Sequence, residues 1–308
     1  MRFFYIYKNL KLIYLLRQLI RAALWLFCAE IKTNNKLLLN QKGPLLIIAN
    51  HPNSFLDAII IGSRYNRRIH FLARGDVFTK KHHRFLLGLL NMIPVYRIRE
   101  GKEFLHLNQY AFDTSVKLLN NNEAVLIFIE GACVNKNELQ PFKKGTARIL
   151  EAAQQSGCSP IIHLAGIAYN NFRGIGKWVN VNLVSFSQKE IITTPKDRVE
   201  FNHQVFNALD KLINPPKIQT AIKKTPLYYL YLPLFHQIEK IADHKTKGTV
   251  FFDSVLFGLL FFSYPLYLLA IISFLLFIGL SLPIIIGTLG VVFLFRNKTL
   301  GLKEPQKN

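Results

Sequence analysis

The sequence has few cysteines, and it lacks the motifs that mark several common enzyme classes. Its three cysteines, Cys28, Cys133 and Cys158, lie far apart without the spacing of a zinc ligand set. A sparse and odd number of cysteines suits a reducing compartment. Neither GxSxG nor HExxH is present, which argues against a serine hydrolase with a nucleophile elbow and against a zinc protease.

Acidic residues are also scarce. The chain has 18 Asp and Glu against 39 Lys and Arg, which gives a formal net charge of +21. Such a balance attracts polyanions, which include nucleic acid and the anionic head groups of a membrane. A basic surface that only serves solubility is a third interpretation. The hydrophobic fraction of 50% is high for a wholly soluble protein.

The C-terminal part contains a long uncharged run, from Ser254 to Phe295. One membrane crossing takes about 20 apolar residues, so this run is roughly twice that length. We interpret residues 251–297 as a membrane hairpin of two helices with a turn near Gly279, Ser281 and Pro283. A single long tilted helix with a re-entrant tail and a buried soluble helix pair are the alternatives.

Basic residues flank this run on both sides. Lys240, Lys245 and Lys247 precede it, and Arg296, Lys298 and Lys303 follow it. The positive-inside rule then predicts that both ends, and the part of the chain before the hairpin, lie on the cytoplasmic face of the membrane. Two features argue against nucleic acid as a partner: the predicted hairpin, and the lack of a recognisable nucleic-acid recognition element in the sequence.

The N-terminal segment, residues 1–35, combines large apolar side chains with periodic Lys and Arg. We interpret residues 8–31 as an interfacial amphipathic helix, because Arg17 and Arg21 would lie in the middle of a bilayer if the helix crossed it. A helix that packs on the core is the alternative. The same charges interrupt the apolar stretch that a signal peptide needs, so we expect no cleaved signal.

Between these ends, apolar runs typical of strands alternate with helical patterns. The expected strands are 45–50, 69–73, 92–98, 124–130, 160–169 and 179–186, and the expected helices are 54–64, 80–90, 102–120 and 145–156. This alternation predicts an α/β domain over residues 36–215, with a mainly parallel sheet flanked by helices. Residues 216–250 form a basic connecting segment, and residues 298–308 are a polar tail.

A histidine follows the first expected strand. Pro52 fixes the backbone after His51, and Asn53 or Ser54 can cap the helix that follows. Asp57 then lies about one turn inside that helix. A carboxylate there can hold one ring nitrogen of His51 and leave the other free to take a proton. The spacing alone is weak, and a capping histidine with a structural aspartate is the alternative.

Two further stretches carry groups suited to binding an anion. In "MIPVYRIREG", Arg97 and Arg99 follow a strand. In "LIFIEGACVNKNELQPFKKG", a strand ends at Glu130-Gly131, and Lys143-Lys144-Gly145 opens a helix after a loop. Ammonium groups beside the N–H donors of a helix start form an anion site. The alternative for each basic pair is a solvated face.

Taken together and in order, these segments resemble the glycerolipid acyltransferases, which acylate glycerol-3-phosphate or lysophosphatidic acid. The family pattern Asn-His-x4-Asp is similar to "NHPNSFLD", and Ile-Pro-Val-x-Arg is matched by "IPVYR". Phe-Pro-Glu-Gly-Thr-Arg with a loop to Phe-Lys-x-Gly resembles "FIEGAC" to "PFKKG". A Pro-containing fourth strand is matched loosely by "SPIIHLAGIA". The resemblance covers roughly residues 36–190.

The resemblance implies a role for each matched residue. His51 would be the general base on the acceptor hydroxyl, and Asp57 would orient it. Arg97 would bind the acceptor phosphate, and Glu130 and Gly131 would shape the acceptor pocket. Lys143 and Lys144, together with Gly145 at the helix start, would add to phosphate binding. No metal or redox cofactor is implied, and the co-substrate would be the thioester of acyl-CoA or of acyl carrier protein.

The chain departs from the family pattern at three places. The His51–Asp57 spacing has one extra residue, which a bulge before the helix would absorb. Cys133 stands where the pattern has arginine, which removes a phosphate ligand that Lys136, Lys143 or Lys144 would have to replace. His163 replaces a proline in the fourth strand. A nucleophilic role for Cys133 is disfavoured, because no base is indicated for it.

The sequence therefore predicts a membrane-bound O-acyltransferase of phospholipid biosynthesis, with membrane lipids as its partners. One alternative is an inactive, membrane-anchored basic protein that binds lipid. Another is an O-acyltransferase whose lipid acceptor carries no phosphate, which Cys133 favours. The acyl chain length and the oligomeric state are not indicated by any pattern in the sequence.

Overall fold

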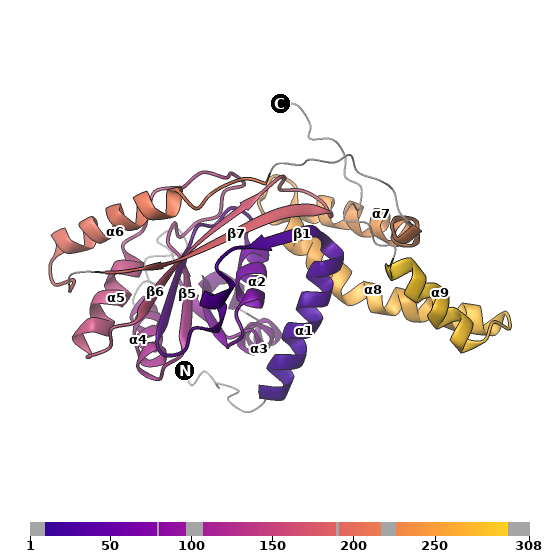
Figure 1. Cartoon of the computed structure of the whole chain (residues 1–308), viewed down its shortest axis with the longest axis horizontal. Coiled ribbons are helices and arrows are strands. Elements are labelled where there is room, and N and C mark those ends of the chain that lie inside the picture. The colour runs from indigo at the N-terminus through magenta and orange to yellow at the C-terminus, as the bar shows by residue number, and fades with distance from the viewer. Residues whose placement is uncertain (1–9, 79, 97–106, 189–190, 217–225, 295–308) are drawn as a thin grey trace.

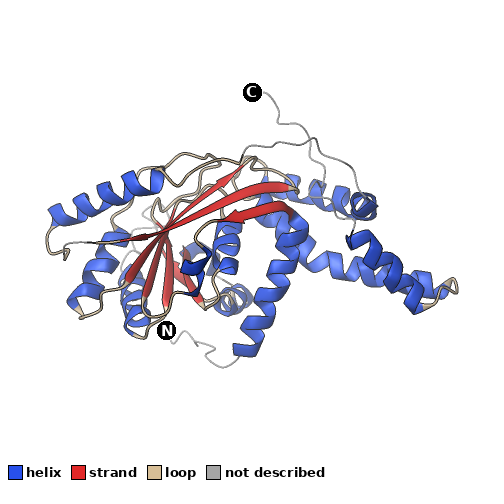
Figure 2. Ribbon diagram, viewed as in Figure 1, coloured by secondary structure: helices blue, strands red, loops and turns tan. Residues whose placement is uncertain are grey.

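A seven-stranded sheet forms the centre of the α/β part of the chain (Figures 1 and 2). The computed structural model describes residues 10–78, 80–96, 107–188, 191–216 and 226–294. The strand order is β1-β7-β6-β2-β5-β3-β4. The strands are β1 (Cys28–Thr33), β2 (Leu45–Ala49), β3 (Ile69–Arg74), β4 (Met92–Val95), β5 (Ala124–Phe128), β6 (Ile161–Tyr169) and β7 (Lys177–Phe186). Among the strands that the structure describes, the β6–β7 pair alone is antiparallel, so the prediction of an α/β fold with a mainly parallel sheet is confirmed.

Helices cover both faces of this sheet. They are α1 (Leu10–Phe27), α2 (Phe55–Arg64), α3 (Lys81–Leu89), α4 (Leu107–Asn120), α5 (Gly145–Gln155), α6 (Pro195–Asp210), α7 (Pro226–Thr246), α8 (Phe252–Phe277) and α9 (Leu282–Leu294). One core cluster lies between the sheet and α1, α2, α7 and α8, and the other lies between the sheet and α4, α5 and α6. Strand β2 contributes Leu45 and Ile47 to the first cluster and Leu46 and Ile48 to the second, as the twofold periodicity of a strand requires.

The N-terminal prediction needs a correction, because the helix ends at Phe27 and a strand follows. Residues Cys28–Thr33 pair in parallel with β7 at the edge of the sheet, and this tertiary pairing overrides the helical pattern of the segment. Arg21 Nε donates to the Ser63 carbonyl at 2.7 Å, and Arg17 donates to the Tyr65 carbonyl at 3.2 Å. These arginines therefore bind the carbonyls that end α2, where cations are favoured.

The other face of α1 is apolar and exposed. Its exposed side chains are Tyr14, Leu15, Leu19 and Trp25. Leu24 and Phe27, in contrast, are buried in the core. The helix thus combines the two interpretations of the sequence: one face packs on the domain, and the other offers apolar side chains outward.

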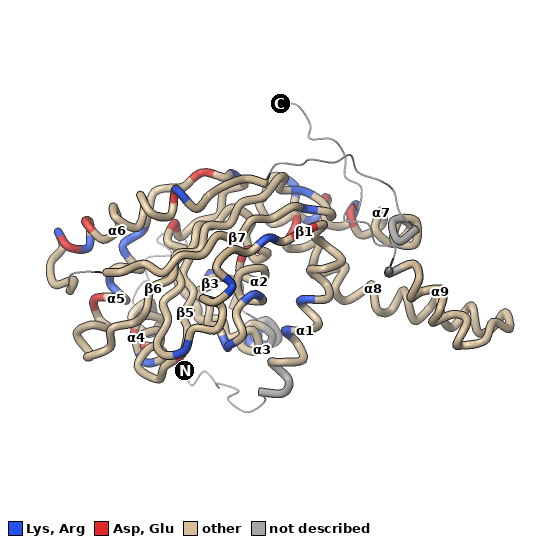
Figure 3. The backbone as a smooth tube through the Cα atoms, in the orientation of Figure 1, with Lys and Arg blue, Asp and Glu red and all other residues tan. Residues whose placement is uncertain are grey.

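The uncharged C-terminal run forms two helices joined by a short turn, as predicted. The chain turns at Gly279, whose φ is +89°, between α8 and α9. Helix α8 is 26 residues long and continues through Pro265. Among the described residues it is the one helix long and apolar enough to cross a membrane; the apolar part of α9, Leu282–Val292, is shorter. Both helices extend away from the sheet and carry almost no charge (Figures 1 and 3).

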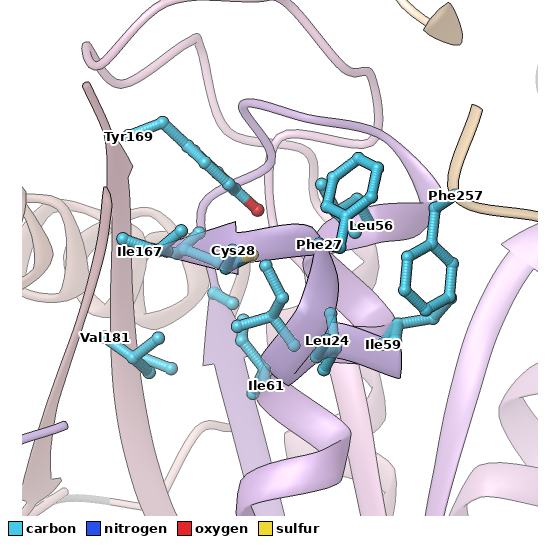
Figure 4. Close-up of a cluster of buried hydrophobic side chains, with 14 of the residues drawn as sticks. Leu24, Phe27, Cys28, Leu56, Ile59, Ile61, Ile167, Tyr169, Val181 and Phe257 are labelled. Atoms are coloured by element: carbon cyan, nitrogen blue, oxygen red, sulfur yellow. The ribbon is translucent and has the colours of Figure 1, made fainter. Parts of the chain in front are cut away.

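The start of α8 belongs to the core of the α/β domain. Phe252, Leu256 and Phe257 are buried in the same cluster as Phe27 and Leu56. Figure 4 shows Phe27, Leu56 and Phe257 in this cluster. The division of the chain into domains at residue 251 stays a prediction. The packing shows that the first turns of α8 are shared between the two parts that this division separates.

Candidate active site

The candidate site lies where two neighbouring parallel strands end. Strands β2 and β5 pair in register up to Ala49 and Phe128, so the residues that follow them meet at one edge of the sheet. His51 comes two residues after β2, and Glu130 comes two residues after β5. The His51 ring stacks on the Phe128 ring, with centroids 3.8 Å apart and planes 10° from parallel. The carboxyl edge of the parallel strands is where α/β proteins place their chemistry.

His51 and Asp57 meet despite the extra residue between them. The distance from His51 Nδ1 to Asp57 Oδ2 is 2.9 Å, the Asp57 side chain is fully buried, and the His51 side chain is 19% exposed. The extra residue is taken up at Ser54, whose φ of +52° and ψ of −139° turn the chain just before α2 begins. Ser54 is the N-cap residue of α2, but its side chain makes no capping hydrogen bond.

Both carboxylate oxygens of Asp57 accept hydrogen bonds. Oδ2 receives the Asn53 backbone N–H at 2.7 Å as well as His51 Nδ1, and Oδ1 receives the Tyr169 hydroxyl at 2.6 Å. Burial, and then the charge of Asp57, raise the pKa of Tyr169, so its hydroxyl stays a donor. This network places the ring proton of a neutral His51 on Nδ1, and Nε2 is left as the basic nitrogen.

Glu130 holds the backbone on both sides of the site. Its Oε2 accepts the His51 N–H at 3.1 Å, and its Oε1 accepts the Gln140 N–H at 3.2 Å. Burial raises the pKa of Glu130 to about 7, against the opposing effect of these two hydrogen bonds. The glutamate that sequence reasoning assigned to the acceptor pocket therefore fixes the position of His51 through its amide.

We expect this carboxyl to make stability depend on pH. Because the pKa of Glu130 is raised to about 7 in the folded chain, unfolding releases a proton between the ordinary carboxyl pKa and about pH 7, and stability falls as the pH rises through that window. The full effect at higher pH is on the order of 3 kcal/mol. In Glu130→Gln this dependence of stability on pH disappears. The backbone N–H of either His51 or Gln140 then faces the NH₂ group of the glutamine and loses its acceptor.

Urea unfolding at about pH 5 and about pH 8 measures this effect. The variant should be the less stable protein at the lower pH, and the gap to the wild type should narrow at the higher pH. A gap that stays constant over this range would show that Glu130 does not titrate there.

Two of the departures from the acyltransferase pattern contact each other. The Ser54 backbone N–H donates to Cys133 Sγ at 2.9 Å, so the cysteine lies against the residue that absorbs the longer His51–Asp57 spacing. Burial raises the pKa of the Cys133 thiol, which keeps it protonated and a poor nucleophile. We infer that the small side chain at position 133 accommodates the bulge at Ser54.

The loop after β5 returns to the site at its basic end. Lys143 N–H donates to the Ile129 carbonyl at 2.9 Å, and a Cβ on Gly131, whose φ is +63°, would come within 2.8 Å of Lys143 Cγ. Lys143 and Lys144 are exposed, and α5 starts at Gly145 directly after them. The structure thus brings this predicted anion site close to Glu130 and Gly131. Arg97 lies outside the described residues, so its role stays a prediction.

His163 lies inside the domain, away from solvent. It is fully buried on β6, and its Nδ1 lies 3.1 Å from the Tyr65 hydroxyl. Burial lowers the pKa of His163 to about 4, so the ring is neutral. The histidine that replaces the proline of the fourth motif is thus a buried polar residue of the sheet.

Sequence reasoning missed Tyr169, and it missed the contacts that Asn50 and Asn53 make at the site. The Tyr169 hydroxyl donates to one carboxylate oxygen of Asp57, and the backbone N–H of Asn53 donates to the other. Asn50 exchanges two hydrogen bonds with the backbone of Ile167, which ties the loop before His51 to β6. Asn50 and Asn53 stand in the motif itself, beside His51. Tyr169 lies more than a hundred residues away, and no local pattern marks it.

Three side chains at the site could in principle serve as metal ligands. Single ligand atoms of His51, Asp57 and Cys133 lie within 4.8 Å of one another. These groups are engaged, because Asp57 accepts from His51, Asn53 and Tyr169, and Cys133 accepts from Ser54. A metal ion would have to displace these hydrogen bonds, so the donor set fits proton transfer better than metal binding.

A buried aspartate behind a partly exposed histidine, at the strand ends of an α/β domain, is an arrangement suited to general-base chemistry. Residues 30–165 match the model of the acyltransferase family, and this segment includes His51, Asp57 and Glu130. The match covers less than half of the chain and indicates an enzyme of the acyltransferase class.

Comparison with curated proteins gave no match. Among solved structures, the chain is similar to the crystal structure of the 1-acyl-sn-glycerophosphate (LPA) acyltransferase PlsC from Thermotoga maritima. The identity is 17% and the TM-score is 0.44, over 70% of this chain and 88% of that one.

Proposed function

We propose that the protein is a membrane-bound O-acyltransferase that moves a fatty acyl group from an acyl thioester to a hydroxyl of glycerol-3-phosphate or a lysophospholipid. The observation that carries this proposal is the His51–Asp57 pair, whose 2.9 Å contact leaves His51 Nε2 free to face a substrate. The donor is acyl-CoA or an acyl carrier protein thioester. The product is an ester of the kind that phospholipid synthesis requires.

The reaction follows from this pair. His51 Nε2 takes the proton of the acceptor hydroxyl while the hydroxyl oxygen attacks the thioester carbonyl. The C–S bond then breaks, and the departing thiolate takes the proton back from the imidazolium. Asp57 stabilises the imidazolium in between, through the hydrogen bond to Nδ1. A thioester is already activated, so positioning and one base suffice, and no covalent enzyme intermediate is needed.

Basic groups near the site favour an acceptor that carries phosphate. Lys143 and Lys144 stand at the start of α5, where backbone N–H groups and the helix dipole attract an anion. Arg97 is the further phosphate ligand that we propose. Cys133 supports a second candidate, an acceptor without phosphate, because a neutral thiol stands where the family pattern has an arginine.

The two candidates are distinguished by a panel of acceptors tested with purified protein and one acyl thioester. Glycerol-3-phosphate and lysophosphatidic acid carry the phosphate, and monoacylglycerol is the matched acceptor without it. We expect ester formation with a phosphorylated acceptor and little with monoacylglycerol. The reverse preference would establish the second candidate, and no ester with any acceptor would contradict the proposed function.

We also propose that the domain works at the cytoplasmic face of a membrane. The apolar side chains of α8 and α9 and the outer face of α1 are exposed. In the sequence, Lys and Arg flank the apolar run on both sides. An apolar cavity of about 370 Å³ lies between α1, α7 and α8, lined in part by Phe27, Phe235 and Phe257. Phe27 and Phe257 also belong to the core cluster that contains Leu56, the neighbour of Asp57.

Membrane binding is tested by placing charges on α8. Leu269 and Phe274 are 59% and 62% exposed, so Leu269→Lys/Phe274→Lys should leave the fold intact. Each lysine near the bilayer centre costs about 3 kcal/mol, and we expect the variant to move from the membrane to the soluble fraction. The matched control is Ile191→Lys/Val199→Lys, two exposed apolar positions next to or on α6. Equal membrane binding of both variants would contradict the role of α8.

A further inference from the structure

The first turn of the apolar helix α8 reaches the loop that carries His51 and Asp57. Asp253, the second residue of α8, accepts a hydrogen bond from Asn53 Nδ2 at 2.8 Å. Ser254 Oγ accepts the backbone N–H of Leu56 at 3.2 Å. Residues 53 and 56 are about 200 positions from these partners in the sequence, so the hydrogen bonds join the C-terminal helix to the motif loop.

Asp253 is itself held in a fully buried ion pair. Lys177 Nζ lies 2.6 Å from Asp253 Oδ2, and neither side chain is exposed. Lys177 also donates to the side-chain oxygen of Asn171 at 2.8 Å, and Asp253 Oδ1 accepts the Gly174 N–H at 2.9 Å. This cluster fixes the start of α8 against the loop between β6 and β7.

These contacts lead directly to the catalytic pair. The backbone N–H of Asn53 donates to Asp57 Oδ2 at 2.7 Å, and the same oxygen lies 2.9 Å from His51 Nδ1. Ser54, the next residue, has a φ of +52°, a conformation that an L-residue keeps only when its surroundings hold it. Asp253 and Ser254 form what we call the α8 clamp. They hold Asn53 and Leu56, which lie on the two sides of Ser54.

A buried ion pair is by itself a weak source of stability, since its desolvation offsets its attraction. The Lys177–Asp253 pair therefore needs another explanation than stability, and holding the His51–Asp57 loop in place is one. We propose that the first turn of α8 is part of the frame of the active site, and that Asp253 and Ser254 are positioning residues that hold the His51–Asp57 loop in its reactive conformation. The inference rests on the proposed function and assigns to the apolar helix a role in catalysis as well as in membrane binding.

Two double variants separate the hold on Asn53 from the ion pair. Lys177→Met/Asp253→Leu removes both, and apolar replacement of a buried pair usually keeps a protein folded. Lys177→Met/Asp253→Asn also removes the charges, but its amide can still hydrogen-bond to Asn53 after that side chain flips. We expect kcat to fall about 10- to 100-fold in the first, with both KM values within about twofold. The second should recover most of kcat.

A folded Lys177→Met/Asp253→Leu with wild-type kcat would overturn the inference, as would equal losses in the two double variants. If the leucine variant does not fold, Ser254→Ala decides. We expect its kcat to fall about 3- to 10-fold at unchanged KM, because Leu56 N–H loses its acceptor. Wild-type kcat in this variant would overturn the inference.

Hydrogen exchange of residues 53–57 provides a readout that does not need activity. Exchange should be faster in Lys177→Met/Asp253→Leu than in the asparagine variant, even with no substrate present. An inactive wild type with this exchange pattern would contradict the proposed function and leave the clamp standing. An active wild type, with exchange in the leucine variant unchanged, would support the proposed function and contradict the positioning role of Asp253.

Discussion

Replacing His51 by alanine should lower kcat for acyl transfer by about 10²- to 10⁴-fold, the usual contribution of a positioned general base. The ring is 19% exposed and stacks on Phe128, so its loss costs part of the packing at the site. Asp57 keeps its hydrogen bonds from Asn53 and Tyr169. We therefore expect a folded protein that still binds membranes, as measured by circular dichroism and co-sedimentation with vesicles.

His203→Ala is the matched control for this variant. His203 is an exposed histidine on α6, where it contacts Asn207 of the same helix. Its loss should leave kcat at the wild-type value. If His51→Ala and His203→Ala had the same rate, His51 would not be the base.

Replacing Asp57 by asparagine should cost about 10²- to 10⁴-fold in kcat while the fold is kept. The amide oxygen can still accept from His51 Nδ1 and Asn53 N–H, and the Tyr169 hydroxyl can rotate to accept from the new NH₂ group. The negative charge that stabilises the imidazolium is lost. KM for both substrates should change little, because Asp57 is buried behind His51 and does not contact them.

Asp113→Asn makes the same chemical change at an exposed position on α4 and should be silent. Steady-state kinetics of the two variants separate the effect of the buried charge from a general loss of charge. If Asp57→Asn raised KM and left kcat unchanged, Asp57 would act in substrate binding instead of supporting the base.

The sequence predicts those parts of the site that lie in local motifs at the ends of strands and helices. The Asn-His segment, the strand ending at Glu130 and the lysines before α5 each stand beside a strand or helix end that periodicity marks, and the parallel sheet brings these ends together. The meeting of His51 and Asp57 required a backbone turn at Ser54. A bulge was expected from the extra residue, but the positive φ of a serine carries no signal in the sequence.

The contacts that sequence reasoning missed are those between distant segments. Tyr169, Lys177 and Asp253 come from β6, β7 and α8, and their contacts join segments that lie far apart in the sequence. Asp253 looks like a boundary charge before a membrane segment, yet it is buried. Strand β1 was assigned to a helix because its pairing with β7 is decided by tertiary structure.

Helix α6, in contrast, carried a signal that was not used. Thr194 and Asp197 form a capping box, and Pro195 stands at the first helical position. These three residues mark the start of a helix from local sequence alone. A search for capping signals between residue 190 and the apolar run would have found this helix.

The most direct test of direct acyl transfer with His51 as the base is to measure thiol release and ester formation together. Purified wild-type protein and His51→Ala are each given an acyl thioester, with and without lysophosphatidic acid. We predict one thiol released for each ester formed by the wild type, no release above background without acceptor, and formation of both products about 10²- to 10⁴-fold slower with His51→Ala. Thiol release without acceptor, at the same rate in both proteins, would contradict the account.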